Sequence, residues 1–307
     1  KTYTLDLSAP FEAEILVNNG RDMTNNTELN VVVSADDSVT EVEAVKLSQN
    51  DSCTGGAWEP YAPGGSGQMR RRFEVAGGDN RERSISAVFR NSAGLESACV
   101  SDTVIVDTEG PRVASVSARA SNGNTERTGS QVIELLLTYE TAGSPCDEVQ
   151  ISEDSSFAER DEITEVDTCA DDPIDFTLSE ENGNKTIYVR AIDALGNFGP
   201  LASTSIELDA EGPALRSVRI ARGAGSIQSG AKYTNRLDLN VTLSGGSVDN
   251  AIRYAFVPRG DDCPRAVELD SVMGYAENFS VRTSGEGSWT LCVALEDDAG
   301  NLSDVVS

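Results

Sequence analysis

The feature that most limits the fold of this chain is an internal repeat of about one hundred residues. Three segments share the pattern of an apolar residue, an aspartate, three further residues with no fixed pattern and a proline. Their prolines, Pro10, Pro111 and Pro213, lie 101 and 102 positions apart, which is the length of one small β-sandwich. The repeat therefore predicts a string of similar domains rather than one large core.

A second shared landmark is a turn sequence of Asn or Asp followed three residues later by glycine, at 91–94, 193–196 and 297–300. The residues before each turn alternate between apolar and polar, as in Ile85, Ala87 and Phe89. A period of two predicts antiparallel strands with one buried face and one face in water. Further strands are expected at 29–33, 45–50, 132–137, 149–154, 237–243 and 256–258.

These landmarks predict an all-β chain of three tandem immunoglobulin-like antiparallel β-sandwiches in an elongated array. We expect an orphan terminal strand at 1–9, a first domain at 10–110, a second at 111–212, and a third at 213–307 that lacks its last strand.

Composition narrows the function. The chain has 51 acidic and 24 basic side chains, a net charge of −27 and no histidine. This charge disfavours nucleic acid as a partner, and the missing histidine excludes the usual Ser-His-Asp and Cys-His catalytic groups. Nor does any apolar run approach the length of a membrane span. We therefore expect a protein that is not an enzyme.

The six cysteines fall two to each repeat and form no Cys-x-x-Cys pair. An even number in this arrangement is typical of disulfides in an oxidising, extracellular compartment. Fifteen pairings are open in principle. One bridge in each repeat is the simplest, and it predicts Cys53–Cys99, Cys146–Cys169 and Cys263–Cys292.

Several short motifs resemble those of bacterial immunoglobulin-like repeats, which occur in large extracellular surface proteins and adhesins. They are Asn18-Asn19-Gly20, Met23-Thr24-Asn25, the stretch from Gly55 to Tyr61, Ser92-Ala93-Gly94 and the stretch from Val106 to Pro111. The resemblance implies a secreted array that displays, spaces or adheres. It implies no catalytic residues and names no receptor.

The spacing of the landmarks also bears on assembly. Thirteen positions separate the turn glycine from the terminal aspartate in the first two repeats, and joining Ser307 to Lys1 restores the same spacing from Gly300 to Asp6. Three explanations stay open: a segment of a longer tandem polypeptide, a subunit that lends its first strand to a neighbour, or a mismatch without meaning for assembly. The lent strand would comprise Thr2, Tyr3, Thr4, Leu5, Asp6 and Leu7.

Two other candidate sites stand out. Acidic residues near the predicted domain ends are candidate calcium ligands, although turn formation explains them equally: Asp107, Glu109, Asp193, Asp209, Glu211 and Asp297. A loop with aromatic and basic residues is a candidate ligand surface, although a loop packed on its own sandwich and a charged edge strand explain it too: Trp58, Tyr61, Arg70, Arg71 and Arg72.

The expected function is structural, as a subunit or segment of an extracellular bacterial fibre that polymerises head to tail. The alternative is an adhesin segment that binds a glycan or a protein on a host or neighbouring cell surface through exposed loops. No cofactor is required in either case, and calcium is the one ion that the sequence suggests.

Overall fold

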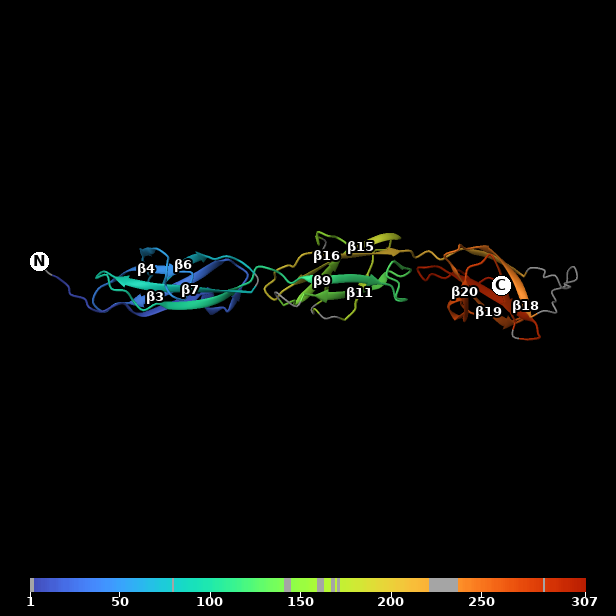
Figure 1. Ribbon diagram of the computed structural model, residues 1–307, viewed down its shortest axis with the longest axis horizontal. Coiled ribbons are helices and arrows are strands. Elements are labelled where there is room, and N and C mark those ends of the chain that lie inside the picture. Colours follow the sequence, from blue (N-terminus) through green and yellow to red (C-terminus); the bar gives the residue numbers. More distant parts are fainter. Residues whose placement is uncertain are drawn as a thin grey trace. The chain divides into compact units, whose positions relative to one another are not determined.

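A computed structural model describes residues 3–78, 80–140, 145–158, 163–166, 169, 172–220, 237–283 and 285–307 (Figure 1). The chain is all-β. The described part of the chain has two short 3-10 segments, η1 (Asn18–Gly20) and η3 (Ala266–Glu268). The chain forms two compact units, one of Lys1–Ser115, Leu137–Asp171 and Tyr188–Ala202, the other of Val116–Leu136, Asp172–Ile187 and Ser203–Ser307.

The first eight strands form two sheets, with the orders β1-β3-β6 and β2-β8-β7-β4-β5. Valine and isoleucine dominate their inward positions, because β-branched side chains fit a pleated surface. The strands are β1 (Phe11–Val17), β2 (Met23–Thr24), β3 (Glu28–Asp36), β4 (Val42–Ser48), β5 (Trp58–Pro60), β6 (Met69–Glu74), β7 (Arg81–Asn91) and β8 (Val100–Val106).

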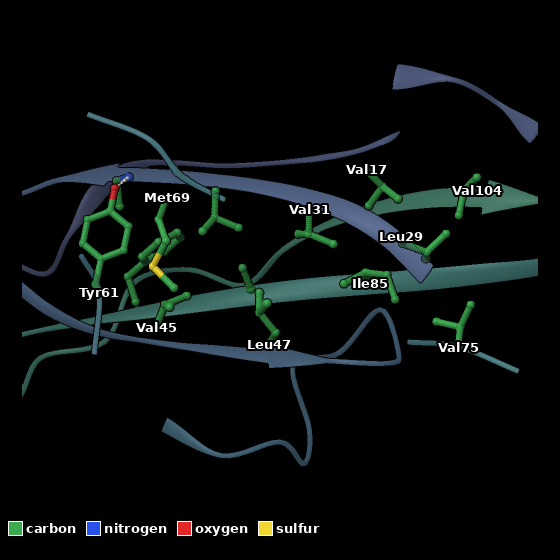
Figure 2. Packing of buried hydrophobic residues seen from close by; sticks show 14 of the residues in the cluster. Val17, Leu29, Val31, Val45, Leu47, Tyr61, Met69, Val75, Ile85 and Val104 are labelled. Carbon is green, nitrogen blue, oxygen red and sulfur yellow. Dashed lines mark hydrogen bonds between the residues drawn. The ribbon is translucent and has the colours of Figure 1, made fainter. Parts of the chain in front are cut away.

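The core of these two sheets draws side chains from both (Figure 2). Val31 of β3 and Val45 of β4 are fully buried, as are Ile85 and Phe89 of β7. Two sheets that share one apolar core make a β-sandwich. The strand expected at 29–33 lies within β3, and the strand expected at 45–50 overlaps the end of β4. The predicted positions Ile85, Ala87 and Phe89 all lie on the buried inner face of β7.

The next eight strands repeat the same sheet orders, β9-β11-β14 and β10-β16-β15-β12-β13. They are β9 (Val113–Arg119), β10 (Arg127–Thr128), β11 (Val132–Tyr139), β12 (Glu148–Ser152), β13 (Thr164–Val166), β14 (Ile174–Thr177), β15 (Gly183–Ile192) and β16 (Ala202–Leu208).

The last six strands form the sheets β17-β18-β21 and β20-β19-β22, again around one shared core. They are β17 (Leu215–Ile220), β18 (Asp238–Gly245), β19 (Ala251–Pro258), β20 (Ser271–Gly274), β21 (Asn278–Arg282) and β22 (Trp289–Glu296).

One sequence prediction about the strands is wrong. The outer faces of β7 and β22 were expected in water, but Ser86 and Cys292 on those faces are fully buried. The reason is that a disulfide-bonded loop covers each face. The Cys53 N–H donates to the Ser86 hydroxyl over 3.2 Å, and Cys292 packs with buried Leu269 and Ala294 in a second, smaller cluster.

Candidate functional site: three joint segments and an open strand position

Three short segments that carry the repeated aspartate adopt the same local turn. We call Asp6–Pro10, Asp107–Pro111 and Asp209–Pro213 the joint segments. In each, the aspartate carboxylate accepts the backbone N–H two residues later: from Ser8 over 2.9 Å, from Glu109 over 3.3 Å and from Glu211 over 3.2 Å. An aspartate turn of this kind fixes the direction in which the chain leaves the preceding strand.

Each of the last two joint segments is held by a turn from further along the chain. In the turn that begins at Asp193, the carboxylate accepts the N–H groups of Leu195 and Asn197, both over 2.9 Å. The Asn197 side-chain amide then donates to the Asp193 carboxylate over 2.8 Å and to the Asp107 carbonyl over 2.9 Å. One amide group thus ties the turn to the joint segment.

The same arrangement recurs at the turn of Asp297. Its carboxylate accepts the N–H groups of Ala299 over 3.0 Å and Asn301 over 2.8 Å. The Asn301 amide bridges the Asp297 carboxylate and the Asp209 carbonyl, over 3.1 and 2.6 Å. We call each bridging amide with its aspartate an amide clamp.

Two glycines allow the close approach that the clamps need. A Cβ on Gly110 would lie 2.2 Å from the carbonyl carbon of Phe198 and 2.3 Å from the nitrogen of Gly199. A Cβ on Gly212, one repeat later, would lie 2.7 Å from the Leu302 carbonyl oxygen. Since the neighbours are backbone atoms, a larger residue would have to displace the joint segment or the turn.

The first joint segment is anchored on the first sandwich by a variant of the same clamp. Here Asn91 supplies the amide, which donates to the Asp6 carboxylate and the Ser8 carbonyl over 3.0 Å each, and to the Asp37 carboxylate over 3.1 Å. Asp6 is only 8% exposed. Hydrogen bonds, foremost from the Thr40 hydroxyl, hold the pKa of Asp6 below its ordinary value.

The residues just before the joint segments differ sharply in burial. Val104 and Val106 precede Asp107, and Ile206 and Leu208 precede Asp209; all four are at most 1% exposed. Before Asp6 the equivalent residues are Tyr3 and Leu5, which are 87% and 77% exposed. Leu7 is also exposed, and Thr2 lies outside the described residues.

The edge of β22 offers the matching position. In the first sandwich β8 pairs with β7, starting at the Val100–Ala87 pair. In the last sheet the equivalent pair is Val306–Val293, which exchanges two hydrogen bonds of 2.9 Å. Beyond it, Trp289 and Leu291 face no strand on this side within the described part of the chain.

Disulfides join Cys53 to Cys99, Cys146 to Cys169 and Cys263 to Cys292, the pairs that one bridge in each repeat predicts. The first and third fasten the loops that cover β7 and β22. These pairs could be predicted from the sequence because two cysteines fall in each repeat.

The candidate calcium ligands lie in the joint segments and clamps. Asp193 and Asp297 use both carboxylate oxygens as acceptors within their own clamps. Among the described residues, no group of three or more His, Cys, Asp and Glu side chains is arranged to hold a metal ion. Calcium binding stays a prediction.

The residues of the candidate ligand loop differ in burial: Tyr61 is buried, and the others are more exposed. Tyr61 agrees with the alternative of a loop packed on its own sandwich: it is 9% exposed, and its ring packs edge-on against Phe89 with the ring centroids 5.4 Å apart. Its hydroxyl donates to the Gly67 carbonyl over 2.9 Å and accepts the Ala35 N–H over 3.3 Å. Burial raises its pKa. Tyr61 therefore anchors its loop to the core and cannot stack on a ligand.

The remaining loop residues are more exposed. Two cations contact the ring of Trp58: the Lys46 Nζ lies 5.0 Å and the Arg90 Cζ lies 4.4 Å from the ring centroid. The arginines occupy β6, an edge strand, where Arg71 pairs with Glu59 at 3.0 Å and Arg72 pairs with Glu28. Since Glu59 belongs to β5 of the other sheet, the Arg71 pair links the edges of the two sheets.

No family model and no curated protein matches this chain. Solved structures do resemble it. A structure concerning host cell surface retention of a 1.5-MDa bacterial ice-binding adhesin is 15% identical, with 97% of this chain and 96% of that chain covered and a TM-score of 0.44. A tetra-tandem repeat from the extending region of a large adhesion protein is 15% identical, with 99% and 76% covered and a TM-score of 0.34.

The FN1–FN3 domains of chicken CNTN1 are 10% identical, with 97% of each chain covered and a TM-score of 0.37. The structural neighbours are thus bacterial adhesin repeats and fibronectin-type modules. Within the described residues, none of the helical segments is long and apolar enough to cross a membrane.

Proposed function

We propose that this chain is a structural subunit or segment of an extracellular bacterial fibre, built from three tandem immunoglobulin-like sandwiches and without catalytic activity. Copies are joined head to tail, and residues 2–7 of one copy complete the third sandwich of the next. The neighbouring copy is either a separate subunit or the adjoining part of a longer polypeptide.

The observation that carries this proposal is the contrast at the three joint segments. Asp6 sits in the same aspartate turn as Asp107 and Asp209 and is held by an amide clamp. The apolar residues before it are nevertheless exposed, whereas their equivalents fill a core. A joint segment fixed on the following sandwich holds its preceding strand in place for a partner.

The register of that strand follows from the first sandwich. Arg83 faces Val104 in the β7–β8 pair, and the equivalents of these residues are Trp289 and Tyr3. Tyr3 of one copy therefore faces Trp289 of the next, and Leu5 enters the core at the position of Val106. Burying these two side chains contributes about 3–6 kcal/mol, and the strand also pairs the open backbone groups of β22.

A disulfide trap tests this register. Facing residues in a hydrogen-bonded antiparallel pair have Cα atoms about 5.5 Å apart, which suits a disulfide. The variant Tyr3→Cys with Trp289→Cys should form a covalent ladder of copies under oxidising conditions. The matched control, Tyr3→Cys with Thr290→Cys, should not, because Thr290 points to the other face of the sheet.

A bridge within a single copy, or no bridge at any concentration, would refute the head-to-tail contact. The mass of native material after reduction and denaturation then separates the two forms of the proposal. Single-copy mass indicates strand donation between subunits, and a multiple of it indicates a longer polypeptide.

A further inference from the structure

A small polar hollow lies on the first sandwich, away from the strand position discussed above. Its volume is about 180 Å³, and all seven side chains that line it are polar: four asparagines, one threonine, one arginine and one glutamate. They come from η1, the link between η1 and β2, β2 itself, the loop that follows β2, and the start of β3. A hollow lined by polar residues suits a ligand that is bound by hydrogen bonds.

The hydrogen bonds already present in the hollow occupy three of its side-chain acceptors. The Asn30 N–H donates to the Asn18 side-chain oxygen over 2.8 Å, and the Glu28 N–H donates to the Asn26 side-chain oxygen over 2.9 Å. The Asn26 N–H likewise donates to the Thr24 hydroxyl oxygen over 3.2 Å. Each of these side chains is thereby oriented with its own N–H or O–H group left as a donor.

The remaining charged groups strengthen this donor character. Arg21 adds a guanidinium that forms no hydrogen bond or ion pair within the described part of the chain, and Glu28, the one carboxylate in the lining, forms an ion pair with Arg72. On a chain of net charge −27, a group of uncommitted donors beside two arginines is unusual. Such a group complements a carboxylate or sulfate oxygen.

The backbone around the hollow is held in a costly conformation. Asn18, Asn19 and Gly20 all have positive φ, at 46°, 58° and 76°. Left-handed conformations at residues other than glycine gather at ligand sites, and asparagine tolerates them better than most residues do. Here they turn the Asn18 and Asn19 amides to the same hollow.

We propose that this hollow binds the acidic group of an anionic saccharide, with Arg21 and the amides of Asn18 and Asn26 donating to its carboxylate or sulfate. The amides of Asn19 and Asn30 can both donate and accept, which suits the hydroxyl groups of the same sugar. The volume is roughly that of six water molecules, so the site takes one sugar residue of a longer chain. This proposal is independent of the head-to-tail contact.

Calorimetry with three probes tests the proposal: trigalacturonate, the neutral trisaccharide maltotriose, and sodium sulfate. We expect trigalacturonate to bind, maltotriose to bind at least tenfold more weakly, and added salt to weaken the binding. Equal binding of the two saccharides overturns the anion site. Sulfate that binds as tightly as trigalacturonate overturns the saccharide specificity and leaves a simple anion site.

One substitution separates binding from folding. Asn26→Asp keeps an oxygen that accepts the Glu28 N–H but replaces the amide donor by a carboxylate, so trigalacturonate affinity should fall by tenfold or more. Asn122→Asp is the matched control: its side-chain oxygen likewise accepts an N–H two residues on, over 2.9 Å, and it lies outside the hollow. Arg21→Gln should also cost about tenfold. Unchanged affinity in Asn26→Asp and Arg21→Gln overturns the assignment.

Discussion

The substitution Gly110→Ala isolates the close contact on which the second joint segment depends. The added Cβ would lie 2.2 Å from the carbonyl carbon of Phe198, 2.3 Å from the nitrogen of Gly199 and 2.6 Å from the carbonyl oxygen of Asn197. Ordinary van der Waals contact begins at 3.4 Å, so the backbone has to shift by about 1 Å. None of these atoms is the end of a flexible side chain that could move aside.

The cost of that shift has two parts. Overpacking of a close contact costs about 1–3 kcal/mol, and separation of the Asn197 amide from the Asp107 carbonyl costs about 1 kcal/mol. The sum is about 2–4 kcal/mol of local stability. Since 1.4 kcal/mol is a factor of ten in an equilibrium constant, amide exchange limited by opening of this turn should accelerate about 30- to 700-fold.

Native-state hydrogen exchange at Gly196 and Gly199 is the appropriate assay, because both N–H groups are bonded in the turn region, to Asp193 over 2.9 Å and to Ala191 over 2.8 Å. Gly65→Ala is the control, since no atom lies within 4 Å of its Cβ position. Gly212→Ala, with its single nearest contact at 2.7 Å, should have an intermediate effect on its own turn. If Gly110→Ala changes exchange no more than Gly65→Ala does, the close contact is not what holds the joint segment.

Three further outcomes follow from the same contacts. Removing the Cys53–Cys99 bridge, which closes 46 residues, should lower the free energy of unfolding of the first sandwich by up to about 4 kcal/mol in denaturant titrations, and should raise exchange at Ser86. The pKa values of Asp6 and Asp37 are both lowered, Asp6 foremost by the Thr40 hydroxyl and Asp37 foremost by the Val39 N–H. Their contribution to anchoring the first joint segment is therefore complete above the ordinary value of 3.8 and disappears as pH falls through the lower folded values, which carboxyl NMR titration with exchange at Ser8 would follow. Because both carboxylate oxygens of Asp193 and of Asp297 already accept hydrogen bonds within their clamps, a chelator should leave the melting temperature unchanged in differential scanning calorimetry; a fall on chelation would instead support calcium as a structural ligand.

The sequence could predict those features that depend on local pattern and spacing. The strands at β3, β7, β11 and β12 follow from alternating apolar residues, and the cysteine pairs follow from the register between repeats. The aspartate turns could also be anticipated, because an aspartate side chain readily accepts a hydrogen bond from the backbone N–H two residues later.

Features that depend on contacts between distant segments could not be predicted in this way. For Tyr61 the sequence left a ligand surface and a loop packed on its own sandwich both open, since nothing in its neighbours in sequence reveals that its ring packs on Phe89 and that its hydroxyl accepts the Ala35 N–H. The buried outer face of β7 arises because the loop of Cys53 folds over it. The donor character of the polar hollow depends on which oxygens the backbone has already occupied, and composition cannot show that.

The amide clamps also bear on how a chain with a net charge of −27 connects its acidic joint segments to the neighbouring turns. At each internal clamp, one asparagine amide connects a carboxylate to a backbone carbonyl, which is the bridging of oxygens that a calcium ion performs in other proteins. At the first joint segment Asn91 takes the place of Asp193 and Asp297. An aspartate there would put a third carboxylate beside Asp6 and Asp37 and would remove the donor that all three of its present acceptors share. The exchange of acid for amide at this position therefore follows from the extra carboxylate of Asp37, and at all three joint segments an asparagine amide supplies the connecting hydrogen bonds.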